Sequence, residues 1–203
     1  MFFESWLALT NCRRYSWNKP WIGCWAARHC APALLGVKPA NLVSLPLEEY
    51  RLLAPQIAWY SHVLRQRGLC FLTLDRQCKT VLLLIYSPAE LKRHLEQESC
   101  RQMLSQAGYP SEGLSEKLLF LQSRLAENQD FPHEIGLFLG YPPRDVLAFQ
   151  QNQGRCCKLC GYWKVYSGLC RARLLFRRYD SCRDYLCSRV ARGETIPQVL
   201  ECA

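Results

Sequence analysis

The chain has 203 residues and a mass of 23.6 kDa, and 49 % of its residues are hydrophobic. This size and composition are typical of a globular domain with a substantial core, and they exclude a disordered protein. The net charge is +9, and residues 155–192 alone hold ten lysines and arginines against two acids. The longest wholly apolar run, 81–86, is far shorter than the ~20 residues that span a bilayer, so we expect no membrane partner.

Thirteen cysteines indicate a reducing compartment. The opening residues, MFFESWLALT, include an early acid and no basic segment, so we expect no signal peptide. A chain that is not exported keeps its cysteines as free thiols, and we therefore expect a cytoplasmic protein without a disulfide framework. Many of the cysteines lie at apolar positions, where a free thiol behaves as a small hydrophobic group.

The first residues differ in character from the rest. Residues 1–27 contain four of the six tryptophans, and we interpret them as an atypical Trp-rich segment, either a loose helix or an irregular cap. A single domain is expected to cover residues 28–203, because no repeat or low-complexity segment divides them.

Helices and short strands alternate within this domain. Apolar residues at three–four spacing mark the helices, and short apolar or β-branched runs mark the strands. Helices are predicted at 46–67, 87–107, 111–127, 133–139, 144–151 and 168–192, and strands at 69–74, 80–86 and 158–166, with a short extended piece at 41–45. The predicted fold class is α+β: a small mixed or antiparallel sheet, made of the β-hairpin 69–86 and the strand 158–166, is covered by helices that include a long C-terminal one.

The strand 158–166 is expected to be central in the sheet. Side chains alternate along a strand, so Tyr162 and Lys164 would face one side and Trp163 the other. The aromatic rings of this strand would then pack against the apolar stripe of the C-terminal helix.

One hypothesis for the function is a small thiol-dependent enzyme, with Cys30 as the nucleophile and His133 as its base. Glu134 or Lys164 would orient or polarise the reacting groups. The thiol would need a lowered pKa, for which the nearby Arg28 and His29 are candidate cations. In a simpler interpretation Cys30 is packed and inert, and Glu134 only favours the positive end of a helix.

A second hypothesis is a transition-metal or iron–sulfur site, because imidazole and thiolate suit zinc, iron and copper. The candidate ligands are His29, Cys30, His133, Cys156, Cys157 and Cys160. The spacing of Cys157 and Cys160 argues against a site if both lie in a strand, because residues three apart then point to opposite faces. No particular metal or cofactor follows from these residues.

A third hypothesis is a non-enzymatic interaction module, because the C-terminal helix is rich in arginine. Arginines on a solvated helix face account for the same pattern, and the chain carries no fingerprint of a DNA- or RNA-binding module. An unknown small molecule or a protein is therefore the expected partner, and nucleic acid is not.

Four segments resemble a bacterial family called domain of unknown function 3793. They are HCAPALLGVKPANLVSL (29–45), VLLLIY (81–86), FPHEIGLFLGYPPRDVLAF (131–149) and CKLCGYWKVYS (157–167). The resemblance covers residues 28–195 and implies a cytosolic, stand-alone domain of this length from anaerobic, Firmicutes-type bacteria. It implies no established activity, so no catalytic role is carried over.

The positions that match the family include the residues that we expect to bind a substrate. These are His29, Lys38, Tyr141, Tyr162, Trp163 and Lys164. Together with Cys30, His133 and Glu134 they would line one pocket, since small-molecule sites are concave and apolar with a few placed polar groups.

Overall fold

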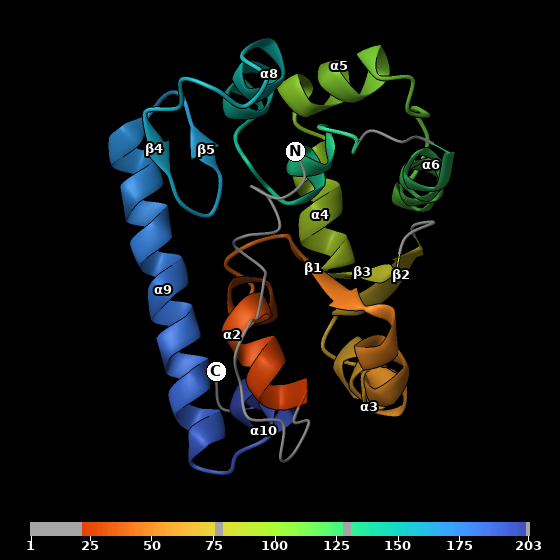
Figure 1. Ribbon diagram of the computed structural model, residues 1–203, viewed down its shortest axis with the longest axis vertical. Helices are drawn as coiled ribbons and strands as arrows, with labels where there is room; N and C mark the ends of the chain where they lie inside the picture. Colours follow the sequence, from red (N-terminus) through yellow and green to blue (C-terminus); the bar gives the residue numbers. More distant parts are fainter. Residues whose placement is uncertain (1–21, 76–78, 128–130, 202–203) are drawn as a thin grey trace.

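The computed structural model describes residues 22–75, 79–127 and 131–201, and Figure 1 shows their arrangement. The chain forms a three-stranded sheet, a separate two-stranded hairpin and helices that pack around both, which confirms the predicted α+β class. In chain order the elements are α2 (Ile22–Leu34), β1 (Ala40–Pro46), α3 (Leu47–Arg65), β2 (Cys70–Asp75), β3 (Thr80–Tyr86), α4 (Pro88–Leu95), α5 (Glu98–Gln106), α6 (Leu114–Glu127), α7 (Ile135–Phe138), α8 (Pro143–Gln151), β4 (Leu159–Cys160), β5 (Lys164–Val165), α9 (Leu169–Ala191) and α10 (Ile196–Glu201).

The main sheet has the strand order β1-β3-β2, and both strand pairs are antiparallel. Strands β2 and β3 are the predicted hairpin, and their register places Leu72 opposite Leu84. The third strand is β1, which corresponds to the extended piece expected at 41–45. Its register places Leu42 opposite the same Leu84, so β3 is the central strand.

The central strand β3 is buried on both faces, because helices cover both sides of the sheet. Leu82 and Leu84 belong to one core, which includes residues of α4 to α8 and of the hairpin. Leu83 and Ile85 belong to a second core, which includes residues of α2, α3 and α10. Because side chains alternate between the faces of a strand, a strand between two cores has a continuous apolar sequence, as VLLLI has here.

Helix α2 begins within the segment that the sequence set apart. Residues 1–21 of that segment lie outside the described residues, and residues 22–27 form the start of α2 and bury Ile22 in the core. The helix continues through Pro32 to Leu34. Pro32 has no backbone N–H, so it cannot donate the helical hydrogen bond that another residue would make at this position.

The other predicted helices lie near their expected positions with one exception, and α10 is a helix that was not predicted. The predicted helix 87–107 is divided into α4 and α5. Helix α4 begins as predicted, since the side-chain oxygen of Ser87 accepts a hydrogen bond from the backbone N–H of Glu90 at 3.4 Å.

The prediction of one central strand at 158–166 is wrong, because the chain turns back there and forms the β4–β5 hairpin, apart from the main sheet. The backbone N–H of Gly161 donates to the carbonyl of Trp163 at 3.2 Å across the turn. Any Cβ at position 161 would lie 2.2 Å from the Phe176 ring, so glycine is what allows the hairpin to lie against α9. The backbone N–H of Tyr166 donates to the carboxylate of Asp145, at 3.0 Å, in place of a neighbouring strand.

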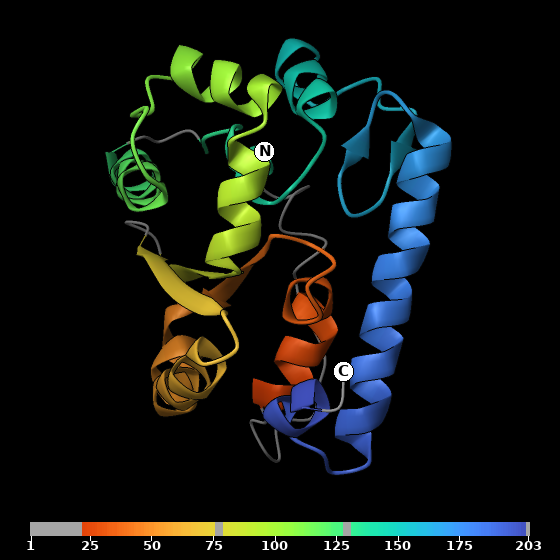
Figure 2. The ribbon, with the colours of Figure 1, turned by 180° about the vertical axis from the view of Figure 1, so that it is seen from behind.

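Helix α9 runs beside both the hairpin and α2, as both views of the molecule show (Figures 1 and 2). It has 23 residues, which corresponds to a length of about 34 Å at the rise of an α-helix. Near its start Ala172 and Tyr179 pack into the first core, and further along Leu186 and Val190 pack into the second. One helix therefore joins the two cores that the sheet separates.

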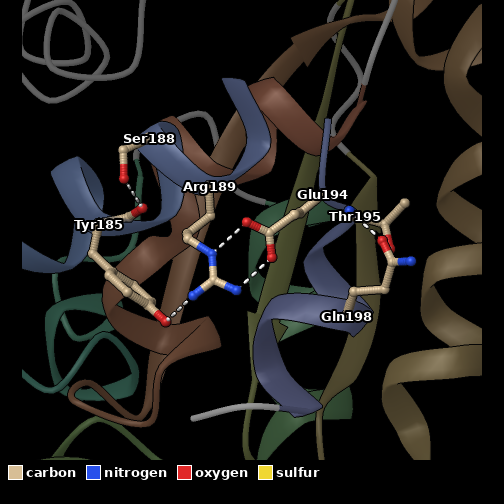
Figure 3. A network of polar contacts seen from close by, with 6 residues as sticks. All are labelled: Tyr185, Ser188, Arg189, Glu194, Thr195 and Gln198. Carbon is tan, nitrogen blue, oxygen red and sulfur yellow. Dashed lines mark hydrogen bonds and ion pairs between the residues drawn. The ribbon is translucent and has the colours of Figure 1, made fainter. Parts of the chain in front are cut away.

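A polar network closes the turn between α9 and α10 (Figure 3). The Arg189 guanidinium pairs with the Glu194 carboxylate through two nitrogens, and its third nitrogen donates to the Tyr185 hydroxyl at 3.2 Å. Hydrogen bonding from Arg189 holds the pKa of Glu194 below its usual value. Thr195 donates from its backbone N–H and its hydroxyl to the Gln198 side chain, both at 2.8 Å, and so caps α10.

Candidate functional site

A cavity of about 390 Å³ lies where α2, β1, the hairpin and α9 meet. Small-molecule sites commonly have volumes of ~300–1,000 Å³ and apolar walls with a few polar groups. The polar and charged lining residues are Arg28, His29, Lys38, Asn41, Ser44, Lys164, Asp180 and Arg183, and the aromatic ones are Phe131, Tyr141, Tyr162, Trp163 and Phe176. The lining thus has the character of a ligand site.

All six residues that the sequence marks as substrate-binding line this cavity. His29 is on α2, Lys38 precedes β1, Tyr141 precedes α8, and Tyr162, Trp163 and Lys164 belong to the hairpin. They come from three stretches of chain that are far apart in the sequence, and the fold brings them together. Their role in binding remains a prediction.

Two tight turns place Lys38 at the cavity. The chain leaves α2 through Gly36, whose φ is +67°, and the backbone N–H of Lys38 then donates to the Pro32 carbonyl at 3.0 Å. The next residue, Pro39, packs against Gly140, whose φ is +73° and whose Cβ, if present, would lie 2.5 Å from the proline ring. Glycine at 140 therefore lets the loop before β1 meet the loop after α7.

Lys38 is buried, although it carries an amine. The side chain is only 3 % exposed, and within the described residues its Nζ has neither a carboxylate partner nor a hydrogen-bond acceptor. The Nζ lies 5.0 Å from the centroid of the Tyr141 ring, whose π-face attracts a cation. Burial lowers the pKa of Lys38 to about 7, and the nearby Cys30 opposes this shift. A buried amine without a partner is rare in proteins, because unpaired charge is costly to desolvate.

Asn41 and His29 add two more unpartnered polar atoms to the same cavity. The Asn41 side chain is 8 % exposed and donates from Nδ2 to the His29 carbonyl at 3.0 Å, while its Oδ1 has no partner. The Nε2 of His29 is also buried without a partner. Burial, aided by the charge of Arg28, lowers the pKa of His29 to about 4, so its ring is neutral at physiological pH.

An aromatic wall closes one side of the cavity. The ring of Tyr141 stacks on Trp163 at 5.3 Å between centroids, and Phe176 meets Trp163 edge to face at 4.6 Å. Trp163 is held in place because its Nε1–H donates to the buried Asp145 carboxylate at 2.8 Å. The other oxygen of Asp145 accepts from the backbone N–H of Ser167 at 3.0 Å, so the carboxylate connects α8 to both ends of β5. The predicted packing of the hairpin aromatics on α9 is confirmed.

The half-exposed part of the lining carries charged groups that are already paired. The Tyr162 hydroxyl donates to the Asp180 carboxylate at 2.9 Å, and Arg183 forms an ion pair with the same carboxylate at 2.9 Å. The Nζ of Lys164 donates to the Gly154 carbonyl at 2.8 Å. These contacts hold the hairpin in place beside α9. Lys38 has no hydrogen-bond or ion-pair partner of this kind among the described residues.

The three residues proposed to act as catalysts do not line this cavity. Cys30 is fully buried in the second core, and burial raises the pKa of its thiol to about 12, which disfavours the thiolate that a nucleophile needs. His133 lines a separate small cavity, where its ring contacts Phe149. Glu134 is buried and forms an ion pair with Arg124 at 2.9 Å. The structure therefore does not bring these three together in one pocket.

The metal hypothesis finds no preformed site within the described residues, where no three His, Cys, Asp or Glu side chains are close enough to hold an ion. Cys160 ends β4 and is exposed, and Cys157 lies ahead of that strand. Cys156 has a φ of +58°, so the chain is bent and not extended at this point.

The arginines on the first half of α9 lie on its exposed face, as expected for a solvated surface. They are Arg171, Arg173, Arg177 and Arg178. Their positions do not add to the cavity lining, in which α9 is represented by Phe176, Asp180 and Arg183.

The sequence alone did not mark two residues that organise the site. Asn41 stands in the row of β1 residues that also holds the buried Val43 and Leu45, and a polar residue in a buried row was the available signal. Asp145 stands in the first turn of a short helix, where an acid is common, so nothing local distinguishes it. Its role depends on a hairpin that the sequence predicts as a strand.

These features define an α+β protein with a sheet between two cores and a cavity that holds a buried lysine. The chain belongs to the family described as "Protein of unknown function (DUF3793)", whose model matches residues 26–200. Comparison with curated proteins and with solved structures gave no significant match. Among the helices of the described residues, none is both long and apolar enough to cross a membrane.

Proposed function

We propose that the protein binds a small organic anion with an apolar or aromatic body in this cavity, and that Lys38 and Asn41 contact its polar groups. The observation that carries this proposal is that the nearly buried amine of Lys38 and the buried, unpartnered Oδ1 of Asn41 line one cavity. A buried polar atom without a partner costs about 1–3 kcal/mol. A ligand whose anionic group accepts from Lys38 and whose hydroxyl donates to Asn41 Oδ1 would remove this cost, and water cannot supply the apolar contacts that the rest of the lining offers.

The charge and shape of the lining support an anion with a flat body. Four lining side chains are basic, namely Arg28, Lys38, Lys164 and Arg183, against the single carboxylate of Asp180 among the described lining residues. The stacked rings of the aromatic wall and the aliphatic side chains of β1 favour a planar apolar group. Ten free cysteines among the described residues support the cytoplasm as the place where this binding occurs.

The geometry gives less support to a thiol-dependent reaction or to a metal site. Cys30 lies outside the cavity lining, and its thiol is held in the protonated form. The basic face of α9 offers charge without a hollow or an aromatic platform, so it carries no comparable proposal.

The proposal is tested by thermal-shift and calorimetric titration with two probes, 3-phenyllactate and phenyl phosphate. Wild type should be stabilised by ~2.7 kcal/mol at a probe concentration of about 100 times Kd. Lys38→Met should bind both probes at least about tenfold more weakly, which corresponds to ~1.4 kcal/mol. Asn41→Leu should weaken 3-phenyllactate to a similar degree, because the hydroxyl of this probe can donate to Oδ1, which phenyl phosphate cannot do. Lys158→Met is the matched control, because Lys158 is exposed and lies outside the cavity lining.

Equal affinity in Lys38→Met and in wild type would place the bound probe elsewhere and contradict the proposal. So would the absence of stabilisation by either probe at millimolar concentration. Circular dichroism of each variant separates lost binding from lost folding.

A further inference from the structure

Lys38 differs from the other lysines of the described residues in its surroundings. Lys79, Lys92 and Lys158 are exposed to solvent, Lys117 donates to the carbonyls of Ser111 and Glu112, and Lys164 donates to the Gly154 carbonyl. Among these six lysines, Lys38 alone is buried in the lining of the cavity, without a carboxylate partner. A side chain that serves only solubility would be in water, so this placement calls for a chemical explanation.

An amine in an apolar cavity favours its neutral form, and a neutral amine is a nucleophile. Lysines that form covalent intermediates are activated in this way, by removal from water in a hydrophobic pocket. Since the pKa of Lys38 is lowered to about 7, about half of the amine is neutral at neutral pH.

We infer that Lys38 is a nucleophilic amine and that the anion bound in the cavity carries an aldehyde or ketone, with which Lys38 forms an imine. The inference rests on the proposed function and names the reactive group of the ligand. The Nζ of Lys38 attacks the carbonyl carbon, and the carbonyl oxygen takes up a proton as a carbinolamine forms. Loss of that hydroxyl as water, with loss of the remaining Nζ proton, leaves a C=N bond. One amine and one carbonyl give one imine and one water, so no oxidant or reductant is required.

The other unpartnered atoms of the cavity fit the proton transfers of this step. The Nε2 of His29 is neutral, buried and without a partner in the lining of the same cavity, so we assign to it the transfer of a proton from Nζ to the leaving hydroxyl, directly or through one water. The Oδ1 of Asn41 can accept a hydrogen bond from the carbinolamine hydroxyl. Both atoms lack a partner in the described residues, as groups that wait for a ligand would.

The test is reductive trapping on the full chain. Phenylpyruvate and 4-carboxybenzaldehyde, both anionic aromatic carbonyl compounds, are incubated with the protein and sodium cyanoborohydride. Reduction of an imine leaves a secondary amine, and the protein mass rises by the mass of the probe less one oxygen atom. We expect close to one adduct per chain, located at Lys38 by peptide mapping, and none on Lys158. Lys38→Met should abolish the adduct, and Lys158→Met should not.

Adducts spread over exposed lysines with Lys38 unmodified would overturn the inference, and peptide mapping of wild type decides this even if Lys38→Met does not fold. Saturable binding of 3-phenyllactate, which has no carbonyl, without any adduct from the two carbonyl probes would overturn the imine while leaving the proposed function in place. Loss of binding for every probe would overturn both. His29→Gln should slow the trapping severalfold at saturating probe, and an unchanged rate at saturation would remove the proton-transfer role.

Discussion

Substitution Lys38→Met keeps the length of the side chain and removes its charge, so it isolates the cost of burying the amine. The pKa of Lys38 falls from 10.5 to about 7 on folding. Because one pKa unit is worth about 1.4 kcal/mol, holding the protonated amine in the fold costs on the order of 5 kcal/mol below neutral pH. Packing of the new side chain and loss of the contact with Tyr141 will reduce the observed gain, so we expect Lys38→Met to be more stable than wild type by ~1–4 kcal/mol.

The pH dependence of this difference is the sharper test. Between pH 7 and 10.5 the unfolded chain binds a proton at Lys38 that the folded chain does not bind, so wild-type stability rises with pH across this window. Lys38→Met lacks this contribution. Its advantage over wild type should be constant below about pH 7 and shrink by roughly 2–3 kcal/mol between about pH 7 and pH 9. Urea denaturation of both proteins with reductant, from about pH 6 to pH 9, measures the difference.

Other groups that face Lys38 do not mimic this signature. In the folded chain neither His29, with its pKa at about 4, nor Cys30, with its pKa at about 12, titrates between pH 7 and 9. The titration of these residues in the unfolded chain is common to both proteins and cancels in the difference. Burial raises the pKa of Tyr141 and of Tyr162 further above its ordinary value. The charged lining groups Arg28, Lys164, Asp180 and Arg183 are present in both proteins. If the difference in unfolding free energy between the two proteins stays constant from about pH 6 to pH 9, the idea that Lys38 is a buried amine with a lowered pKa is wrong.

Three further predictions concern the hairpin, and thermal melts check each one. Asp145→Ala should cost about 3 kcal/mol or more, because it strands the indole N–H of Trp163 and two backbone donors; an unchanged melting temperature would show that the network is not formed. Trp163→Ala should cost about 3–5 kcal/mol, as aromatic truncations in cores do, whereas a cost within ~0.5 kcal/mol would mark an exposed ring. Gly161→Ala should cost about 1–3 kcal/mol, because the added methyl group collides with the Phe176 ring. Gly168→Ala is its control: the added methyl group meets no atom within 4 Å, and the φ of +64° should cost about 1–2 kcal/mol through backbone strain alone. Near-UV circular dichroism should change in Gly161→Ala and not in Gly168→Ala.

Local sequence patterns predicted the elements whose partners lie nearby in the chain. The β2–β3 hairpin follows from two apolar runs around a polar turn, and the start of α4 follows from Ser87 at its cap. The hairpin at 158–166 was missed because its backbone donates to the carboxylate of Asp145 and not to a neighbouring strand of the main sheet. Asp145 lies far away in the sequence, so no local pattern connects it to the hairpin. Its aromatic and β-branched residues favour an extended chain in either case.

The candidate site, too, was predicted only in part from the sequence. The six residues of the substrate-binding prediction lie around one cavity because they belong to segments dense in glycine and proline, which permit close approach of distant loops. The Cys30 hypothesis rested on the chemistry of residue types, and burial reverses that chemistry by raising the thiol pKa. Depth in the core is set by tertiary packing, and the burial of Cys30 agrees with the simpler interpretation, in which this residue is packed and inert.

Helix α9 crosses from one core to the other, and the cavity lies along its side with lining residues drawn from both halves of the molecule. A ligand held between Lys38 and the hairpin would therefore connect the region around α2 with the hairpin, and we expect these two regions to unfold locally and independently when no ligand is bound. In hydrogen–deuterium exchange this predicts slower exchange on binding both in α2 and in the hairpin, not only at the residues touched. The empty protein should exchange as two units and the occupied one as a single cooperative unit.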